Sequence, residues 1–222
     1  MIQIIPAILS TSEEDYARDV SRYKQSLLLR NKQSEFFKEG WVHIDFMDNK
    51  FVPNKSIEPS VIDKYPTNLH KEAHLMVSHP LEWIESLVKT GFERIIFHVE
   101  SEDDINECIK SIKSKGLGVG LAINFETPIE KLTAFVHKIE VILVMTIKPG
   151  FQGQPFIPAA LNKVKEIKSK NWPVSLGVDG HVRDENIKEV IKSGVDFVIA
   201  GSYLLKGDVD ENLEILWEEI RG

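Results

Sequence analysis

Short apolar runs alternate with amphipathic segments along almost the whole chain. Eight of these runs contain mostly branched and aromatic side chains and are four to seven residues long, as in buried strands. They are residues 3–9, 41–45, 73–77, 94–99, 119–124, 141–146, 174–179 and 197–200. Between several of them, apolar residues recur with the spacing i, i+3, i+4, which predicts helices with one buried face. Strands that alternate with helices pair in parallel, so the pattern predicts an α/β protein.

Three of the helical stripes are sharply defined. They consist of Ile105, Cys108, Ile109 and Ile112; Ile187, Val190 and Ile191; and Leu213, Leu216, Trp217 and Ile220. Gly116 and Gly194 follow the first two stripes. Glycine suits the left-handed position just past the end of a helix, so we expect these helices to end there.

The number of strand–helix units favours a closed barrel. Eight units in 222 residues match the usual size of a (β/α)8 or TIM barrel that folds as one domain. An open doubly wound sheet is the alternative, and the absence of a GxGxxG motif after the first run counts against it. We find no linker, and therefore predict a single barrel domain over residues 1–222. The longest irregular segments follow the second and sixth runs, where barrel loops form the catalytic face.

Composition excludes some classes of partner. Hydrophobic residues make up 42% and charged residues 27% of the chain, which is the ordinary range for a soluble domain. The net charge is −7 and no basic face is evident, so we expect no nucleic-acid partner. No apolar run is long enough for a bilayer, so we expect no membrane partner. The single cysteine, Cys108, allows no intrachain disulfide, and the first residues carry no basic leader, so we predict a cytoplasmic protein.

Two histidines and two aspartates stand at the ends of predicted strands. His43 and Asp45 are two residues apart and so point to one face of their strand. His74 lies in the third run and Asp179 ends the seventh. The ends of barrel strands converge, and a His2Asp2 set suits a borderline divalent ion. We predict one bound ion, with Zn²⁺ the first choice and Fe²⁺, Mn²⁺ or Co²⁺ as alternatives.

The methionines share one location. Apart from Met1, they are Met47, Met76 and Met145, and each falls at the end of a predicted strand. Filling a core is the commonest role of methionine, yet none of the three belongs to a helical stripe. We therefore predict that they line the mouth of the barrel.

Glycines follow the last three predicted strands. The run KPGFQGQPF at residues 148–156 contains Gly150 and Gly153, whose backbone N–H groups are free to face an anion. Gly180 follows the seventh run, and Gly201 and Ser202 follow the eighth. Barrels commonly bind phosphate with these last loops, so the pattern predicts a phosphorylated substrate.

These motifs, in this order, resemble the ribulose-phosphate 3-epimerase family. PAILS is similar to the family's PSILS, and VHIDFMDNKFVPN to its HxDxMDGxFVPN; EAHLMV, LVMTIKPGFQGQPFI, GVDG and AGS complete the series. The resemblance implies a metal-dependent isomerase on a (β/α)8 barrel. It would convert D-ribulose 5-phosphate to D-xylulose 5-phosphate through an enediolate. It would also form a homo-oligomer, either a dimer or a hexamer.

The resemblance also implies roles for individual residues. The metal ligands would be His43, Asp45, His74 and Asp179, of which Asp45 and Asp179 would also be the acid/base pair. Residues 150–153 would form a mobile loop, and Gly180, Gly201 and Ser202 would hold the phosphate. The full set in contact with the substrate would be Ser10, Met47, His74, Met76, Met145, Gly150, Phe151, Gln152, Gly153, Asp179, Gly180, Gly201 and Ser202.

The chain departs from the family pattern at a few positions. His181 replaces a glycine of the family's DGG, where it would be an added donor to the phosphate or have no role there. Asn49 replaces the glycine of MDG, and Lys148 replaces an asparagine before PGF; residues 12–40 form a longer segment than usual. GQPFIP and the missing second glycine are shared with the related allulose-6-phosphate 3-epimerases. D-allulose 6-phosphate is therefore the alternative substrate.

Two other interpretations of the motifs agree with the sequence less well than an epimerase does. Decarboxylases on related phosphate-binding barrels show DxKxxD after a strand, and no such lysine follows Asp45 here. A catalytically inactive sugar-phosphate-binding barrel would keep the glycines and lose a ligand, but all four ligands are present. Metal analysis together with a proton-exchange assay separates these alternatives from an epimerase.

Overall fold

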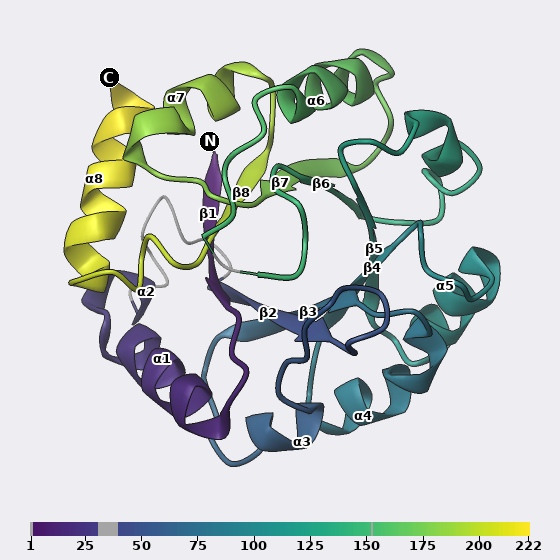
Figure 1. Ribbon diagram of the computed structural model, residues 1–222, viewed down its shortest axis with the longest axis horizontal. Coiled ribbons are helices and arrows are strands. Elements are labelled where there is room, and N and C mark those ends of the chain that lie inside the picture. The colour runs from purple at the N-terminus through teal and green to yellow at the C-terminus, as the bar shows by residue number, and fades with distance from the viewer. Residues whose placement is uncertain (1, 31–39, 152) are drawn as a thin grey trace.

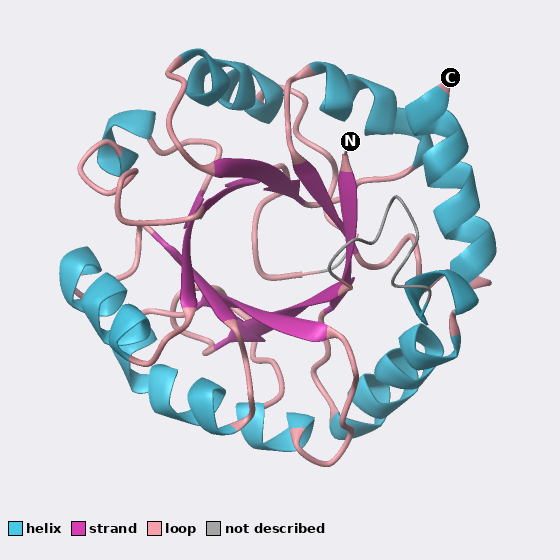
Figure 2. Ribbon diagram, turned by 180° about the vertical axis from the view of Figure 1, so that it is seen from behind, coloured by secondary structure: helices cyan, strands magenta, loops and turns pink. Residues whose placement is uncertain are grey.

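The strands close into a barrel in chain order. The computed structural model describes residues 2–30, 40–151 and 153–222. Its strands are β1 (Gln3–Ile8), β2 (Trp41–Met47), β3 (His70–Met76), β4 (Arg94–His98), β5 (Gly118–Ile123), β6 (Val141–Met145), β7 (Ser175–Asp179) and β8 (Phe197–Ala200). All neighbours pair in parallel, and β1 pairs with β8 to close the ring. Figure 2 shows this ring inside a ring of helices. The predicted TIM barrel is confirmed, and the open sheet is excluded.

Helices connect most of the strands on the outside. They are α1 (Glu13–Gln25), α2 (Leu27–Arg30), α3 (Pro59–Ile62), α4 (Ile84–Lys89), α5 (Ile105–Ser114), α6 (Ala160–Ser169), α7 (Asp184–Lys192) and α8 (Val209–Arg221), with the 3-10 helices η1 (Pro80–Glu82) and η2 (Ile129–Leu132). The connection from β5 to β6 contains only η2, so the regular alternation is broken there. No helix in the described part of the chain is both long and apolar enough to span a membrane.

The ends of two helices agree with the expected glycine stops. Gly116 after α5 has a φ of 78° and Gly194 after α7 a φ of 100°. The stripe on α5 buries Cys108, Ile109 and Ile112 against the barrel. Local periodicity therefore placed both the buried face and the end of this helix correctly.

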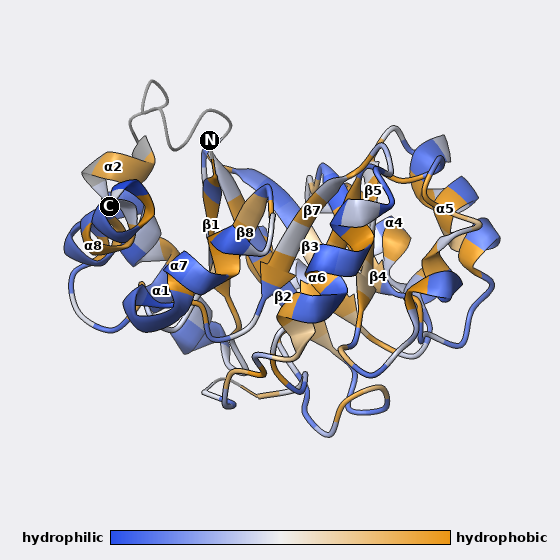
Figure 3. Cartoon of the chain, turned by 90° about the horizontal axis from the view of Figure 1, so that it is seen from above, coloured by the Kyte–Doolittle hydropathy of each residue, from blue (hydrophilic) through white to orange (hydrophobic). Residues whose placement is uncertain are grey.

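The barrel is packed on both faces of its sheet. Side chains such as Ile44 and Phe46 face outward and contact the helices. Inward-facing side chains, among them Ile5, Leu143 and Phe197, fill the interior of the ring. Figure 3 shows apolar colour along the strands and polar colour over much of the outer helices. Because parallel strands are buried on both faces, they are nearly continuous apolar runs in the sequence.

The two longest loops after strands lie at the end of the barrel where the strands terminate. They span residues 48–58 after β2 and 146–159 after β6, and Figure 1 shows the second crossing the centre of the barrel in projection. Asn54 Nδ2 donates a hydrogen bond to the carbonyl oxygen of Gly150 at 2.8 Å and so ties the two loops together. Both loops therefore lie at the end of the barrel where we expect the catalytic face.

A glycine inside the barrel supports the packing of β7 against β8. A Cβ atom on Gly177 would lie 2.2 Å from the ring of Phe197. We expect Gly177→Ala to lower the free energy of unfolding by about 1–3 kcal/mol, the usual cost of overpacking a core. Urea unfolding measures this. Ser175→Ala, an exposed position in the same strand, is the matched control. Equal midpoints for Gly177→Ala and the unmodified protein would show that the Phe197 ring is not confined.

Candidate active site

Four ligand-type side chains meet where β2, β3 and β7 end. The register places Asp45 beside His74 across β2 and β3. The potential ligand atoms of His43, Asp45, His74 and Asp179 all lie within 4.8 Å of one another. Asp45 Oδ1 is 2.8 Å from His74 Nδ1 and 3.4 Å from His43 Nε2. Asp179 Oδ2 is 3.5 Å from His74 Nδ1. The predicted convergence therefore takes place.

The donor set fits a divalent cation. His43 Nε2 is buried and has no hydrogen-bond partner among the described residues. It faces the carboxylates of Asp45 and Asp179, at 3.4 Å and 3.9 Å. Two imidazoles and two carboxylates, converging on one point, are suitable ligands for Zn²⁺ or a similar ion. The cluster could therefore hold one metal ion.

The ion pair of Glu72 and Arg94 orients the His43 ring from the side opposite the cluster. Its Nδ1 lies 2.7 Å from Glu72 Oε1, and Glu72 Oε2 accepts a hydrogen bond from Arg94 Nε at 2.7 Å. The Arg94 guanidinium in turn stacks 4.2 Å over the ring of Trp41. A carboxylate on the far nitrogen of a metal-binding histidine fixes the ring and its tautomer. Here it leaves Nε2 of His43 free to face the cluster.

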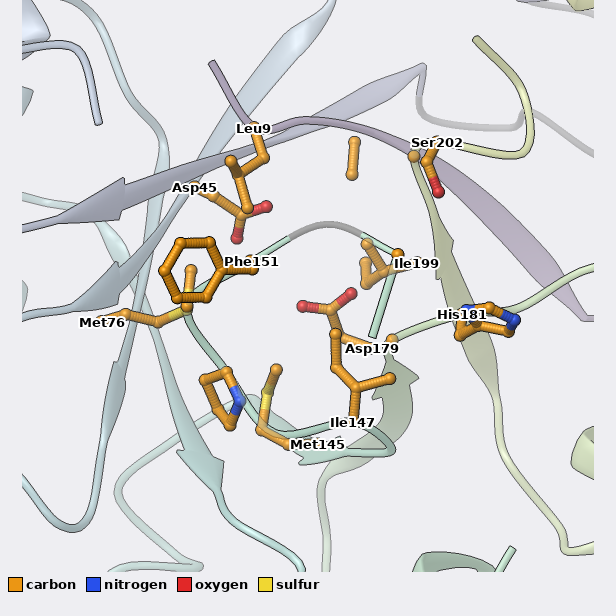
Figure 4. A pocket seen from close by; sticks show the side chains of 16 residues that line it. Leu9, Asp45, Met76, Met145, Ile147, Phe151, Asp179, His181, Ile199 and Ser202 are labelled. Atoms are coloured by element: carbon orange, nitrogen blue, oxygen red, sulfur yellow. The ribbon is translucent and has the colours of Figure 1, made fainter. Parts of the chain in front are cut away.

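A pocket opens directly above this cluster. It encloses about 570 Å³, counting its open mouth. Figure 4 shows the carboxylates of Asp45 and Asp179 pointing toward each other across it. Ten of the predicted site residues line it: Asp45, Met76, Met145, Gly150, Phe151, Gly153, Asp179, Gly180, Gly201 and Ser202. Parts of the chain that are far apart in sequence thus form one cavity.

Comparison with known proteins agrees with this geometry. A profile of the Ribulose-phosphate 3 epimerase family matches residues 3–205. The chain belongs to this family. Its relatives include the ribulose-phosphate 3-epimerase of Chlamydia muridarum, 36% identical over 75% of this chain and 77% of that protein. They also include the cytoplasmic isoform of Oryza sativa subsp. japonica, 37% identical over 73% and 74% of the two chains.

Solved structures share the fold of this family member at lower identity. The 3-hexulose-6-phosphate synthase of Salmonella typhimurium superposes with a TM-score of 0.69 and 14% identity, over 99% of both chains. That similarity shows the barrel alone. Family membership establishes the chain as an isomerase that acts on carbohydrates. The predicted family and enzyme class are confirmed.

Some predicted residues lie outside the pocket wall of this epimerase-family barrel. His43 and His74 are fully buried below it, and Met47 packs behind Met76. Ser10 is buried, and its Oγ has no hydrogen-bond partner among the described residues. Gln152 lies outside the described residues. The substrate contacts assigned to these residues remain predictions.

Five further residues line the pocket without having been predicted from the sequence: Ala7, Leu9, Ile147, Pro149 and Ile199. His181, for which the sequence left a role at the phosphate open, lines it as well. The other five are apolar residues in strands or loops and carry no chemical signal. Glu72 could have been found, because it precedes His74 by two positions and so points into the same interior.

His181 adopts a backbone conformation that favours glycine, the residue that the family pattern has at this position. Its φ is 58°, in the left-handed region that side chains rarely enter. Asn186 holds this turn, since its Nδ2 donates to the His181 carbonyl oxygen at 2.8 Å and its Oδ1 accepts from the Arg183 N–H at 2.9 Å. The side chain of His181 bonds to the backbone of Gln154 in the β6 loop. The departure from the family's double glycine therefore places a side chain in the pocket wall, on a turn with the positive φ typical of glycine.

The two aspartates of this family member differ in proton affinity. Burial raises the pKa of Asp179 to about 6, and the negative charge of Asp45 acts in the same direction. Burial also opposes the charged form of Asp45, but the neighbouring His43 and His74 rings hold its pKa well below the usual range. Two carboxylates with separated pKa values can divide the roles of acid and base between them.

Proposed function

We propose that the protein is a metal-dependent ribulose-phosphate 3-epimerase that interconverts D-ribulose 5-phosphate and D-xylulose 5-phosphate. The observation that carries this proposal is the pair of carboxylates, Asp45 and Asp179, on opposite sides of one pocket. Inversion at a carbon next to a carbonyl needs a base on one face and an acid on the other. The relatives are named ribulose-phosphate 3-epimerases, which supports the pentulose phosphate as substrate.

The aspartates carry the proton in this mechanism. One carboxylate takes the proton from C3 and leaves the electron pair in an enediolate; the other, protonated, donates its proton to C3 from the opposite face. Which of Asp45 and Asp179 is the base depends on the direction of the reaction. A divalent ion held by His43, Asp45, His74 and Asp179 would supply Lewis-acid stabilisation of the negative charge on the enediolate.

The methionines support this chemistry because they keep acidic protons away from the enediolate. Met76 and Met145 line the pocket and are almost fully buried. Their thioethers are polarisable and carry no acidic proton. They would therefore surround the enediolate without protonating it, which leaves proton return to the aspartate.

The phosphate is proposed to bind at Gly180, Gly201 and Ser202. These residues line the pocket beyond Asp179, in the loops after β7 and β8. A Cβ on Gly180 would lie 2.9 Å from the backbone nitrogen of Ile147, at a φ of 124°, so glycine is required for this close approach. The net charge of −7 gives no long-range attraction, so recognition of the phosphate has to be local.

We expect Gly201→Val to raise the KM for the phosphorylated sugar at least ~10-fold, as for the loss of a charge-assisted hydrogen bond. The reason is space: a Cβ at this position would already lie 3.2 Å from the carbonyl oxygen of Ala7. Steady-state kinetics measures the change. Free D-ribulose, which has no phosphate to place, serves as the control and should be a poor substrate of both proteins. Equal use of free and phosphorylated ketoses would contradict the phosphate assignment.

A substrate panel tests the proposed reaction. The protein is assayed with D-ribulose 5-phosphate and with D-allulose 6-phosphate, each in the presence of Zn²⁺, Fe²⁺, Mn²⁺ or Co²⁺. We expect the larger kcat/KM for the pentulose phosphate. His181 and the GQPFIP run favour D-allulose 6-phosphate as the second candidate, and a preference for it would assign the chain to that branch. Failure to exchange the C3 proton with solvent, with metal bound, would indicate an inactive sugar-phosphate-binding barrel.

Two further properties are proposed, the location of the protein and its oligomeric state. We infer a cytoplasmic location, since the single cysteine allows no intrachain disulfide and one relative is named a cytoplasmic isoform. We also infer a homo-oligomer, either a dimer or a hexamer. Light scattering distinguishes these from a monomer.

A further inference from the structure

A chain of hydrogen-bonded side chains runs from the candidate metal cluster to Glu100, just past the end of β4. Nε2 of His74 lies 3.0 Å from Nε2 of His98, and Nδ1 of His98 lies 3.1 Å from Oε2 of Glu100. Both histidine side chains are fully buried, and the ring of Phe51 packs 4.8 Å from that of His98. The contact between the two histidines therefore lies away from solvent, whereas Glu100 is partly exposed, and none of the three residues belongs to the pocket wall.

The hydrogen atoms along this chain can be assigned from its far end. Glu100 Oε1 accepts a hydrogen bond from the backbone N–H of Asn124 at 3.0 Å. Glu100 Oε2 faces His98 Nδ1 at 3.1 Å, and an ionised carboxylate can only accept hydrogen bonds. His98 Nδ1 must therefore donate to Glu100.

The hydrogen position on His98 then fixes the hydrogen position on His74. A neutral imidazole that carries hydrogen on Nδ1 has an acceptor at Nε2. Two nitrogen atoms 3.0 Å apart share one hydrogen, so His74 Nε2 is the donor. The lone pair of His74 Nδ1 is then left facing Asp45 and Asp179, at 2.8 Å and 3.5 Å.

We propose that His98 and Glu100 are positioning residues that hold His74 in the tautomer whose Nδ1 can bind the divalent ion. This inference rests on the proposed metal dependence. The two histidines of the cluster would then bind through different nitrogens, Nε2 in His43 and Nδ1 in His74. In each case the buried partner of the other nitrogen, Glu72 or His98, decides which nitrogen is free. Such partners typically contribute ~10- to 100-fold to metal affinity.

Glu100→Gln is the sharpest test, because it should reverse the chain of hydrogen bonds. The backbone N–H of Asn124 can only donate, so the new amide must turn its oxygen there and its NH2 group toward His98. His98 would then carry hydrogen on Nε2 and donate to His74, which puts the hydrogen of His74 on Nδ1, where the ion should bind. We expect the Kd for Zn²⁺, measured by chelator competition, to rise ~10- to 100-fold.

Two substitutions of His98, by glutamine and by leucine, distinguish an effect on the His74 tautomer from an effect on packing. His98→Gln keeps an acceptor within reach of His74 and no longer depends on Glu100, so its Kd for Zn²⁺ should stay within about threefold of the unmodified protein. His98→Leu fills similar space without an acceptor and should raise the Kd as Glu100→Gln does. Adding Glu100→Gln to His98→Gln should change nothing further. Because this pair retains Glu100, it also tests the proposal if Glu100→Gln fails to fold.

Histidine ¹⁵N NMR on the Zn²⁺-loaded protein gives a readout that packing alone does not move. His98 should be protonated at Nδ1, and at Nε2 once Glu100 is replaced by glutamine. Tight Zn²⁺ binding by Glu100→Gln, or an unchanged His98 tautomer in it, would overturn the inference while leaving the epimerase assignment intact. If the unmodified protein bound no Zn²⁺, Fe²⁺, Mn²⁺ or Co²⁺, both the metal-dependent function and this inference would be overturned.

Discussion

Removing the divalent ion with a chelator is expected to abolish epimerisation and to lower the thermal midpoint of unfolding. Asp45 and Asp179 face each other in a buried cluster, and their mutual repulsion is one cause of the raised pKa of Asp179. An ion that binds only the folded state stabilises it by about 2.7 kcal/mol when its concentration is 100 times Kd. Scanning calorimetry and a C3 proton-exchange assay measure the two effects.

The control for chelation is restoration of the ion. Excess Zn²⁺ added after removal of the chelator should recover both turnover and the thermal midpoint. Chelation of a protein without a bound ion should change neither quantity. Full turnover in protein shown by elemental analysis to contain no metal would refute the proposed metal dependence.

Asp45→Asn and Asp179→Asn are each expected to reduce turnover at least ~100-fold, the usual effect of losing a positioned acid or base. Asparagine preserves size and one acceptor oxygen but cannot take up a proton. Because both residues are also candidate ligands, turnover is measured at saturating metal, with bound metal determined in parallel. Asp104→Asn is the matched control: it removes the same charge at an exposed helix N-cap, where asparagine is an equally good cap.

Each aspartate variant should also separate proton exchange from inversion. The remaining carboxylate can still remove and return a proton on its own face, so slow exchange of the C3 proton with solvent should continue for one epimer only. The two variants should retain it for opposite epimers. Retained epimerisation in either variant, with metal bound, would exclude that residue from the acid/base pair.

The pattern of apolar runs predicted the eight strands closely because parallel strands in a barrel are buried on both faces. The main difference lies in β3, which begins at His70 rather than at residue 73. Its first residues are polar, and Glu72 is buried in the barrel by its ion pair with Arg94 and its contact with His43. A buried polar residue that is compensated by a partner on another strand cannot be recognised from local hydrophobicity.

The sequence by itself determined the candidate metal-binding cluster, because the two-residue period of a strand puts His43 and Asp45 on one face and parallel strands end together. It did not determine which side chains contact the two candidate histidine ligands from the side opposite the cluster. That Glu72 supports His43, that His98 supports His74, and that Met47 packs behind Met76 depend on how far neighbouring strands are shifted along each other. Local backbone geometry decides to which face of the sheet each side chain points. How deep that side chain lies in the barrel, and which residues it contacts, follow from the closure of all eight strands.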